Sequence, residues 1–164
     1  MANNVSQAIY PGGDMSKTLN SSIDIEAPAR DVWELLIDFA AFPSWNPFIV
    51  DAEGLPQVGS QLRLRMQPVG GSAVTLQPTV VEVIDGQRLR WEGRFVVRGL
   101  FDADHLFIVE PRGAARSRLV QQEAFSGLLV PFFRRSLDRG TLPAFQAMNM
   151  ALKERAEKAI GARR

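Results

Sequence analysis

Three polar residues lie on otherwise apolar strand faces in the second half of the sequence: His105, Gln121 and Glu123. Side chains alternate between the two faces of a strand, so the segments 101–110 and 115–125 each direct every second residue inward. The other members of the inward-facing set are apolar: Leu89, Trp91, Phe107, Val109, Leu119 and Phe125. A mostly apolar pocket with a few convergent polar groups is the usual construction of a small-molecule site.

Glu123 and His105 are the candidates for catalysis. A carboxyl group in an apolar cavity has a raised pKa because desolvation disfavours the charged form, which suits a general acid or base. His105 could be its acid–base partner or could orient a ligand carbonyl. A structural interpretation stays open for both residues, as a buried hydrogen-bonded glutamate and a core histidine. Gln121 is interpreted as a hydrogen-bonding residue of the pocket wall.

The composition excludes several other classes of site. With no cysteine and one histidine the chain predicts no disulfide and no zinc site, and without a Gly-rich phosphate loop it predicts no nucleotide cofactor. No nucleophile-elbow motif indicates a Ser-His-Asp triad. We therefore expect neither a metal nor a cofactor.

Charge and hydropathy predict a protein without a nucleic-acid partner or an integral membrane segment. Nineteen Lys and Arg against eighteen Asp and Glu leave a formal net charge of +1, which argues against a general nucleic-acid or membrane-surface binder. The one basic cluster, Arg134, Arg135 and Arg139, is interpreted as a solvated helix face. No apolar run is long enough to span a bilayer and no signal peptide is visible, so we expect a cytoplasmic protein.

The elements that must position these residues follow from periodicity. The C-terminal segment carries an apolar stripe at helical spacing, which predicts one long helix: Phe145, Met148, Leu152, Ala156 and Ile160. Pro28 can begin a helix, and two short helices are expected up to Trp45. Seven strands are predicted: 18–26, 48–53, 61–67, 73–84, 88–97, 101–110 and 115–125. Pro78 should produce a bulge or an edge in the fourth of them.

The predicted class is α+β, with a curved seven-stranded antiparallel sheet around the C-terminal helix. With 164 residues and 46% hydrophobic content, the chain suits one domain with its own core. We expect that domain at 18–164, preceded by a flexible arm at 1–17 that has no sustained periodicity.

The sequence also resembles a known superfamily. The opening, Pro28-x-x-x-Val32-Trp33 followed by Phe42-Pro43-x-Trp45-Asn46-Pro47, is similar to that of SRPBCC proteins, the START and birch-pollen-allergen-like helix-grip superfamily. The second half resembles its bacterial polyketide-cyclase/dehydrase-like branch through His105-x-Phe107, Glu123-x-Phe125-x-Gly127 and Phe145-x-x-Met148-Asn149. The resemblance covers about residues 18 to 160. It implies a helix-grip fold with a deep apolar cavity between the sheet and the long helix.

The resemblance adds residues to the candidate site. It places the cavity entrance near Trp45 and Asn46, so Trp45 could cover the mouth or anchor the helices, and Asn46 could contact a ligand or form a turn. Met66, Met148 and Asn149 could line the cavity, together with the inward residues Trp91, Phe107 and Phe125.

Three functional hypotheses follow, because fold does not imply function. The first is a binding module for a hydrophobic small molecule such as a lipid, an aromatic or a polyketide-like compound. The second is a cyclase or dehydratase in which Glu123 and His105 act as acid and base. The third is a protein-interaction module of the co-chaperone or assembly type. A monomer or a homodimer is compatible with all three.

Overall fold

The computed structural model describes residues 15–94 and 97–162. Its elements are, in order, β1 (Ser16–Ile25), α1 (Ala29–Ile37), the 3-10 helix η1 (Phe39–Ser44), β2 (Ile49–Glu53), β3 (Arg63–Met66), β4 (Val74–Leu76), β5 (Thr79–Ile84), β6 (Arg88–Arg94), β7 (Asp102–Gly113), β8 (Arg116–Ser126), α2 (Val130–Ser136), the π-helical turn η2 (Leu137–Thr141) and α3 (Leu142–Gly161). The predicted α+β helix-grip class is confirmed. Of the predicted arm, residues 1–14 lie outside the described residues, whereas Ser16 and Lys17 already belong to β1.

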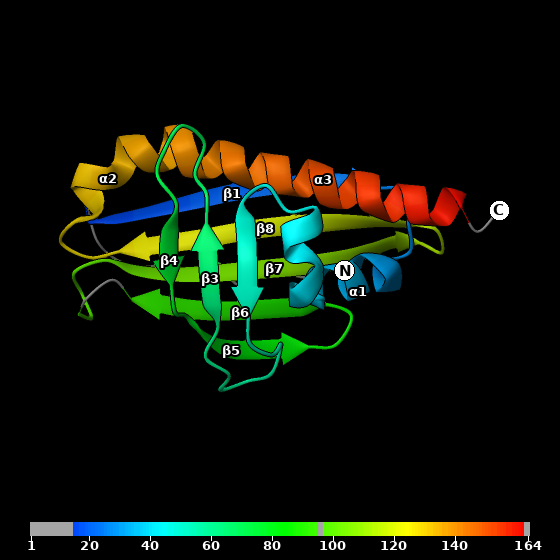
Figure 1. The fold of residues 1–164 in the computed structure, drawn as a ribbon, viewed down its shortest axis with the longest axis horizontal. Helices are drawn as coiled ribbons and strands as arrows, with labels where there is room; N and C mark the ends of the chain where they lie inside the picture. The colour runs from blue at the N-terminus through cyan, green and yellow to red at the C-terminus, as the bar shows by residue number, and fades with distance from the viewer. Residues whose placement is uncertain (1–14, 95–96, 163–164) are drawn as a thin grey trace, which may run out of the picture.

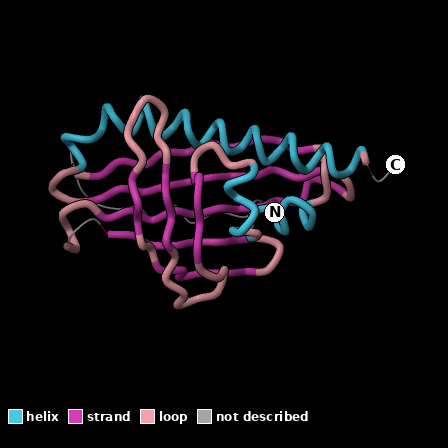
Figure 2. Tube along the Cα trace, viewed as in Figure 1, coloured by secondary structure: helices cyan, strands magenta, loops and turns pink. Residues whose placement is uncertain are grey.

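The strands form two sheets. A five-stranded antiparallel sheet has the order β1-β8-β7-β6-β5, and a three-stranded sheet has the order β2-β3-β4. In Figure 1 the strands of the small sheet cross those of the large one, and Figure 2 shows α3 running along the whole length of the assembly. We call the face of the large sheet that is turned toward the small sheet and α3 the inner face.

The predicted count of seven strands is wrong by one, because the segment 73–84 divides at Pro78 into β4 and β5. A proline has no N–H to donate to a ladder. The Pro78 carbonyl accepts from Leu62 N at 2.8 Å, and Val80 N donates to Ser60 O at 2.9 Å. The chain therefore leaves the small sheet at Pro78 and enters the large one, which makes this proline the junction of the two layers.

The register of the large sheet brings the predicted polar residues together. Trp91 lies opposite His105, and His105 lies opposite Glu123 in the neighbouring ladder. Phe107 lies opposite Gln121. All five side chains are buried, so the predicted alternation of these strands is confirmed.

The stripe on α3 faces the core as predicted. Phe145, Met148, Leu152 and Ala156 are buried and Ile160 is half-buried. Polar contacts fix the C-terminal half of α3 to β1, since Lys153 Nζ donates to Asp24 O at 3.0 Å. Among the described residues, no helix is long and apolar enough to cross a membrane.

The two short helices predicted between the first two strands are present as α1 and η1. Pro28 precedes α1 as its N-cap, and Val32, Trp33 and Leu36 turn into the core. Trp33 Nε1 donates to Asp85 Oδ1 at 3.0 Å, which ties α1 to the turn between β5 and β6. These helices close the end of the molecule opposite to α2 (Figure 1).

Candidate functional site

An apolar pocket of about 260 Å³ lies between the two sheets, next to α2 and η2. The large sheet contributes the end of β6, the start of β7 and the end of β8, and the small sheet contributes β3 and β4. The wall consists of Phe48, Met66, Pro68, Val74, Leu76, Arg94, Phe101, Ala103, Glu123, Phe125, Phe133, Leu137 and Thr141. Three of the predicted site residues are in this wall: Glu123, Met66 and Phe125.

Glu123 is the buried carboxyl group of the pocket. Burial, and secondarily the negative charge of Asp104, raises the pKa of Glu123 from 4.5 to about 8. A carboxyl group loses its strong hydration when it is buried, and a nearby negative charge further disfavours ionisation. At neutral pH Glu123 is therefore mainly protonated, and it presents an O–H donor as well as an acceptor.

His105 lies on β7, directly opposite Glu123 of the neighbouring strand β8. Its Nδ1 is 3.6 Å from Glu123 Oε1, and its ring stacks on Phe107 with ring centres 4.3 Å apart. Burial lowers the pKa of His105 from 6.5 to about 3, although a hydrogen bond to Gln121 opposes this shift. The imidazole is consequently neutral at physiological pH.

A buried hydrogen-bond chain connects His105 to α3. Gln121 Oε1 lies 3.2 Å from His105 Nε2, and Gln121 Nε2 donates to Asn149 Oδ1 at 2.5 Å and to Phe145 O at 3.4 Å. Asn149 Nδ2 then donates to Ser21 Oγ on β1 at 3.0 Å. Because the Phe145 carbonyl can only accept, the amide nitrogen of Gln121 faces α3 and its oxygen faces His105.

The orientation of the Gln121 amide group determines which tautomer His105 adopts. The ring must donate from Nε2 to the oxygen of Gln121, so Nδ1 carries no proton. Within the described part of the chain, Nδ1 is buried and has no hydrogen-bond partner. A bare Nδ1 facing a protonated Glu123 at 3.6 Å is an acceptor placed just beyond the reach of its donor.

Arg94 supplies the one positive charge in the wall, as far as the described residues show. It is exposed at the end of β6, two residues beyond the last pairing of that strand with β5. The pocket thus has a neutral carboxyl group in its interior and a guanidinium group at its edge.

The other predicted site residues lie outside this wall. Trp91, Phe107 and Met148 are buried core side chains, and Gln121 and Asn149 belong to the hydrogen-bond chain. The space opposite the first half of α3, where the resemblance implied a cavity, is filled around Phe145. Its ring lies 5.2 Å from that of Phe48 and 5.0 Å from that of His105.

Trp45 and Asn46 are also outside the wall. Asn46 Oδ1 accepts from the backbone N–H groups of Phe48 and Ile49 at 2.9 Å each, which is the turn geometry that the sequence left open. The Trp45 ring packs edge-to-face on Phe42 with ring centres 5.2 Å apart, so it covers the end of η1, whose Phe42 is buried in the core.

Sequence reasoning missed the wall residues that come from α2, η2 and β4. Phe133 and Leu137 are spaced by four residues after Pro131, which is a helical signal that precedes the C-terminal stripe. Phe101 and Ala103 share the parity of His105 and could have been found by extending the alternation of that strand. Alternation with Trp91 would place Arg94 on the outer face, and it does line the hollow there, but beyond the end of β5 it also borders the inner pocket.

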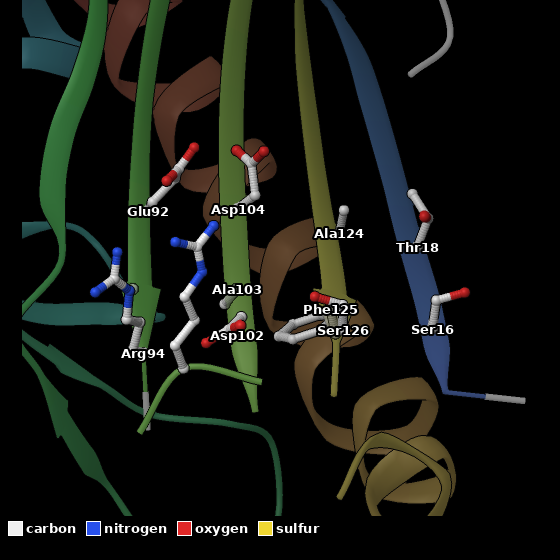
Figure 3. A pocket seen from close by; sticks show the side chains of 12 residues that line it. Ser16, Thr18, Glu92, Arg94, Asp102, Ala103, Asp104, Ala124, Phe125 and Ser126 are labelled. Atoms are coloured by element: carbon white, nitrogen blue, oxygen red, sulfur yellow. The ribbon is translucent and has the colours of Figure 1, made fainter. Parts of the chain in front are cut away.

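A second hollow of about 400 Å³ lies on the outer face of the large sheet, where β6, β7, β8 and β1 present polar side chains (Figure 3). Its carboxylates have partners within the protein. Asp104 accepts from Arg90 at 2.7 Å and 2.6 Å, and Asp102 Oδ2 accepts from Gly99 N at 2.8 Å. In the described ranges no three His, Cys, Asp or Glu side chains are grouped so that they could hold a metal ion. The inner pocket is therefore the better candidate site.

Comparison with known proteins identifies the family and supports the fold. The sequence model of the family described as "Polyketide cyclase / dehydrase and lipid transport" matches residues 16–157. No curated protein matches the sequence. Similar solved structures include the ZhuI aromatase/cyclase from Streptomyces sp. R1128, with a TM-score of 0.74 and 19% identity over 88% of this chain and 96% of that one.

Two further solved structures have the same fold. Norcoclaurine synthase from Thalictrum flavum, in complex with dopamine and hydroxybenzaldehyde, has a TM-score of 0.67 and 14% identity over 87% of each chain. A START superfamily protein from Mycobacterium smegmatis has a TM-score of 0.66 and 18% identity over 87% of this chain and 98% of that one. The family match covers nearly all the described elements, from β1 into the last turns of α3, and the chain therefore belongs to the polyketide cyclase/dehydrase and lipid transport family.

Proposed function

We propose that this protein binds a small apolar molecule that carries a carbonyl or similar oxygen, held in the inner pocket against Glu123. The observation that carries the proposal is a buried carboxyl group, neutral at physiological pH, in the wall of an otherwise apolar pocket. Such a group can donate a hydrogen bond without the cost of burying a charge. The family's description, which joins cyclases, dehydrases and lipid transport, is consistent with ligands of this class.

The size of the pocket restricts the ligand. Pockets that hold drug-sized molecules have volumes from about 300 Å³ upward. The volume of this pocket, about 260 Å³, is slightly below that range. A one-ring or two-ring aromatic compound, or a short acyl chain, fits better than a long lipid. Arg94 at the edge favours an additional acidic or phenolic group on the ligand, although the interior itself is apolar.

The direct test compares 2-acetylnaphthalene with naphthalene by calorimetric titration, since the two differ only in the carbonyl-bearing group. We expect wild type to bind the ketone more tightly below pH 8, and to lose this preference above pH 8 when Glu123 ionises. In Glu123→Gln the amide N–H₂ donates at every pH, so the preference should not depend on pH. In Glu123→Leu it should be absent throughout.

Two outcomes would contradict the proposal. If the preference for the ketone has the same pH dependence in Glu123→Gln as in wild type, Glu123 does not contact the ligand. If neither compound binds and native mass spectrometry of freshly purified protein shows no bound small molecule, the pocket is not a ligand site.

An acid–base role in a cyclase or dehydratase reaction is the second candidate. Its support is the pKa of Glu123, which lies near physiological pH, together with the Nδ1 of His105, which lies 3.6 Å from Glu123 Oε1 and has no hydrogen-bond partner among the described residues. A general acid or base works best when its pKa is close to the operating pH. In this scheme Glu123 exchanges a proton with the ligand, and His105, on the neighbouring strand, positions the carboxyl group.

Proton exchange at the methyl group of 2-acetylnaphthalene tests this second candidate, because the methyl protons are acidified by the carbonyl. Loss of the methyl signal in D₂O, followed by NMR, should be accelerated by wild type and not by Glu123→Gln, while Glu123→Gln still binds the ketone. If the methyl protons exchange at the same rate with both proteins, Glu123 does not catalyse the exchange, and only the binding function would remain.

A further inference from the structure

One end of the molecule gathers exposed apolar side chains from three distant segments of the chain. Gly127 N donates to Met15 O at 3.0 Å, Leu128 N donates to Gly99 O at 3.1 Å, and Leu129 N donates to Leu100 O at 3.0 Å. The start of β1, the turn before β7 and the entry to α2 are therefore held side by side. Figure 1 shows α2 and these turns at the end of the molecule opposite to the C-terminal end of α3.

Four large apolar side chains project from these segments, and we call them the apolar tip. Their exposed fractions are 53% for Met15, 58% for Val97, 62% for Leu128 and 81% for Phe132. Single exposed apolar residues are ordinary, but several of them on neighbouring segments at one end of the molecule indicate a surface that is covered in use. A phenylalanine that is four-fifths exposed gains nothing from the fold and would gain from any apolar environment.

Arginines adjoin the apolar tip. Arg135 follows Phe132 by one helical turn and is exposed, and Arg139 is exposed in the next turn. Arg98, next to Val97, instead lines the outer hollow together with Glu92, Asp102 and Asp104. The one acidic residue between Phe132 and Arg139, Asp138, is neutralised by Lys17 at 2.7 Å. The sequence alone interpreted the basic cluster as a solvated helix face, but the folded chain places it beside apolar side chains. The combined surface is apolar and positively charged.

We propose that the apolar tip and its arginines dock the protein on an anionic lipid bilayer, with Phe132 and Leu128 inserted at the headgroup boundary. Aromatic and aliphatic side chains flanked by arginines are the composition of interfacial membrane anchors. The arginines would meet the negative surface of the bilayer, where basic residues are attracted within a Debye length. Separate projecting side chains on turns and one short helix suit a deformable bilayer better than a preformed groove of a protein partner.

The docking surface is continuous with the inner pocket. Phe133, the residue after Phe132, and Leu137 one turn later are both in the pocket wall. Phe133 also packs edge-to-face on Phe101 with ring centres 5.5 Å apart. If the pocket binds an apolar ligand, as proposed above, docking would let that ligand exchange with the bilayer without crossing water. The docking itself does not depend on ligand binding, so the two proposals can fail separately.

Vesicle flotation of the full chain tests the proposal. The vesicles are phosphatidylcholine alone, or equal parts of phosphatidylcholine and phosphatidylglycerol. We expect wild type to float with the anionic vesicles, and Leu128→Ser with Phe132→Ser to reduce its partition coefficient at least about tenfold, because two large apolar side chains no longer insert. Arg135→Gln with Arg139→Gln should abolish the difference between the two kinds of vesicle, and added salt should do the same.

Matched controls come from elsewhere on the surface. Leu55→Ser with Val58→Ser removes two side chains of similar exposure, 58% and 66%, in the turn between β2 and β3. Arg155→Gln with Lys158→Gln removes two exposed positive charges near the other end of α3. Both controls should float like wild type. The proposal would be overturned if wild type floated with neither kind of vesicle. It would also be overturned if a control variant lost as much binding as the tip variant. In the first of these cases the surface would be assigned to a protein partner instead.

Discussion

His105 and Glu123 are two titratable groups that burial drives toward their neutral forms. An ion pair between them would place two charges in an environment with little water, which is costly unless further hydrogen bonds compensate. The chain from Ser21 through Asn149 and Gln121 supplies an acceptor to His105 Nε2, and this selects the tautomer that carries its proton on Nε2. Burial, and not this hydrogen bond, is what disfavours the imidazolium, so the neutral pair is the form that the desolvated surroundings support.

This pair predicts the dependence of stability on pH. Glu123 has a folded pKa of about 8 against 4.5, so its contribution to stability is lost as the pH rises toward 8. His105 has a folded pKa of about 3 against 6.5, so its contribution is lost as the pH falls toward 3. Between pH 4.5 and 6.5 the two opposite effects cancel, and we expect maximal stability there. Above that range the free energy of unfolding should fall by up to about 1.4 kcal/mol per pH unit.

Urea unfolding at a series of pH values measures this profile. Glu123→Gln should remove the decrease above pH 6.5 and keep the decrease in acid. His105→Gln should weaken the acid decrease, to which Asp85 also contributes because Arg30 lowers its pKa. A wild-type slope above pH 6.5 that Glu123→Gln shares would show that Glu123 is already ionised in the folded protein.

For single residues, the sequence predicted which face of the sheet each side chain occupies, but not whether that side chain borders the pocket. Alternation along two strands placed His105, Gln121 and Glu123 inward, and all three are buried there. Which of them reaches the pocket depends on neighbours from other elements. Phe145 of α3 packs on His105, whereas Glu123, which lies opposite His105 on the neighbouring strand, borders the pocket. Alternation assigns both residues to the same face and gives no signal for this difference between them.

The turn from β8 into α2 leads into the helix that closes the pocket, and Gly127 makes this turn possible. Gly127 has φ +125°, a region that other residues adopt at a cost of about 1–2 kcal/mol. A Cβ at this position would lie 2.6 Å from Leu100 O and 2.8 Å from Gly99 O, which is closer than van der Waals contact allows. The close approach is what allows Leu128 and Leu129 to bond the turn before β7.

Gly127→Ala should therefore lower the free energy of unfolding by more than about 3 kcal/mol, through backbone strain and displacement of the turn together. Gly113→Ala is the matched control, because Gly113 has φ +139° and nothing within 4 Å of an added Cβ. It should cost only the strain, about 1–2 kcal/mol. Equal losses for the two variants in urea unfolding, at unchanged m-value, would mean that the turn relaxes around the methyl group.

Among the elements, the sequence predicted those with a strong period and missed those that depend on a partner. The stripe of α3 spans several turns and was recognised, as were α1 and η1. The strand predicted over 73–84 combined two strands, because both halves have strand propensity and only the hydrogen bonds of Pro78 show that they belong to different sheets. The segment of α2 and η2 contains Gly140, which weakens its helical signal, yet Gly140 O accepts from Val69 N at 3.1 Å and stabilises the turn.

The whole molecule places its pocket between two sheets and not along the length of α3. The small sheet crosses the large one, so their side chains fill the central region and separate toward one end, where α2 and η2 close the gap. The resemblance implied a cavity bounded by the long helix, and a sequence cannot show where crossing layers separate. The location of the pocket depends on the division of the chain at Pro78 and on the course of the segment 127–141.

Filling the pocket tests its place in the whole molecule. A ligand that binds only the folded state raises the free energy of unfolding, by about 2.7 kcal/mol at a hundred times its dissociation constant. With 2-acetylnaphthalene as the ligand, we expect this rise in wild type and none in Ala103→Phe, because the larger ring occupies the space beside Glu123 and Phe125. Ala124→Phe is the control, since Ala124 lines the hollow on the outer face instead (Figure 3). Should Ala124→Phe lose the ligand-induced rise while Ala103→Phe keeps it, the outer hollow would be the binding site and the roles assigned to Glu123 would be wrong. Because Ala103 borders the outer hollow as well, it is the combination of a lost rise in Ala103→Phe and a retained rise in Ala124→Phe that would place the ligand between the two sheets.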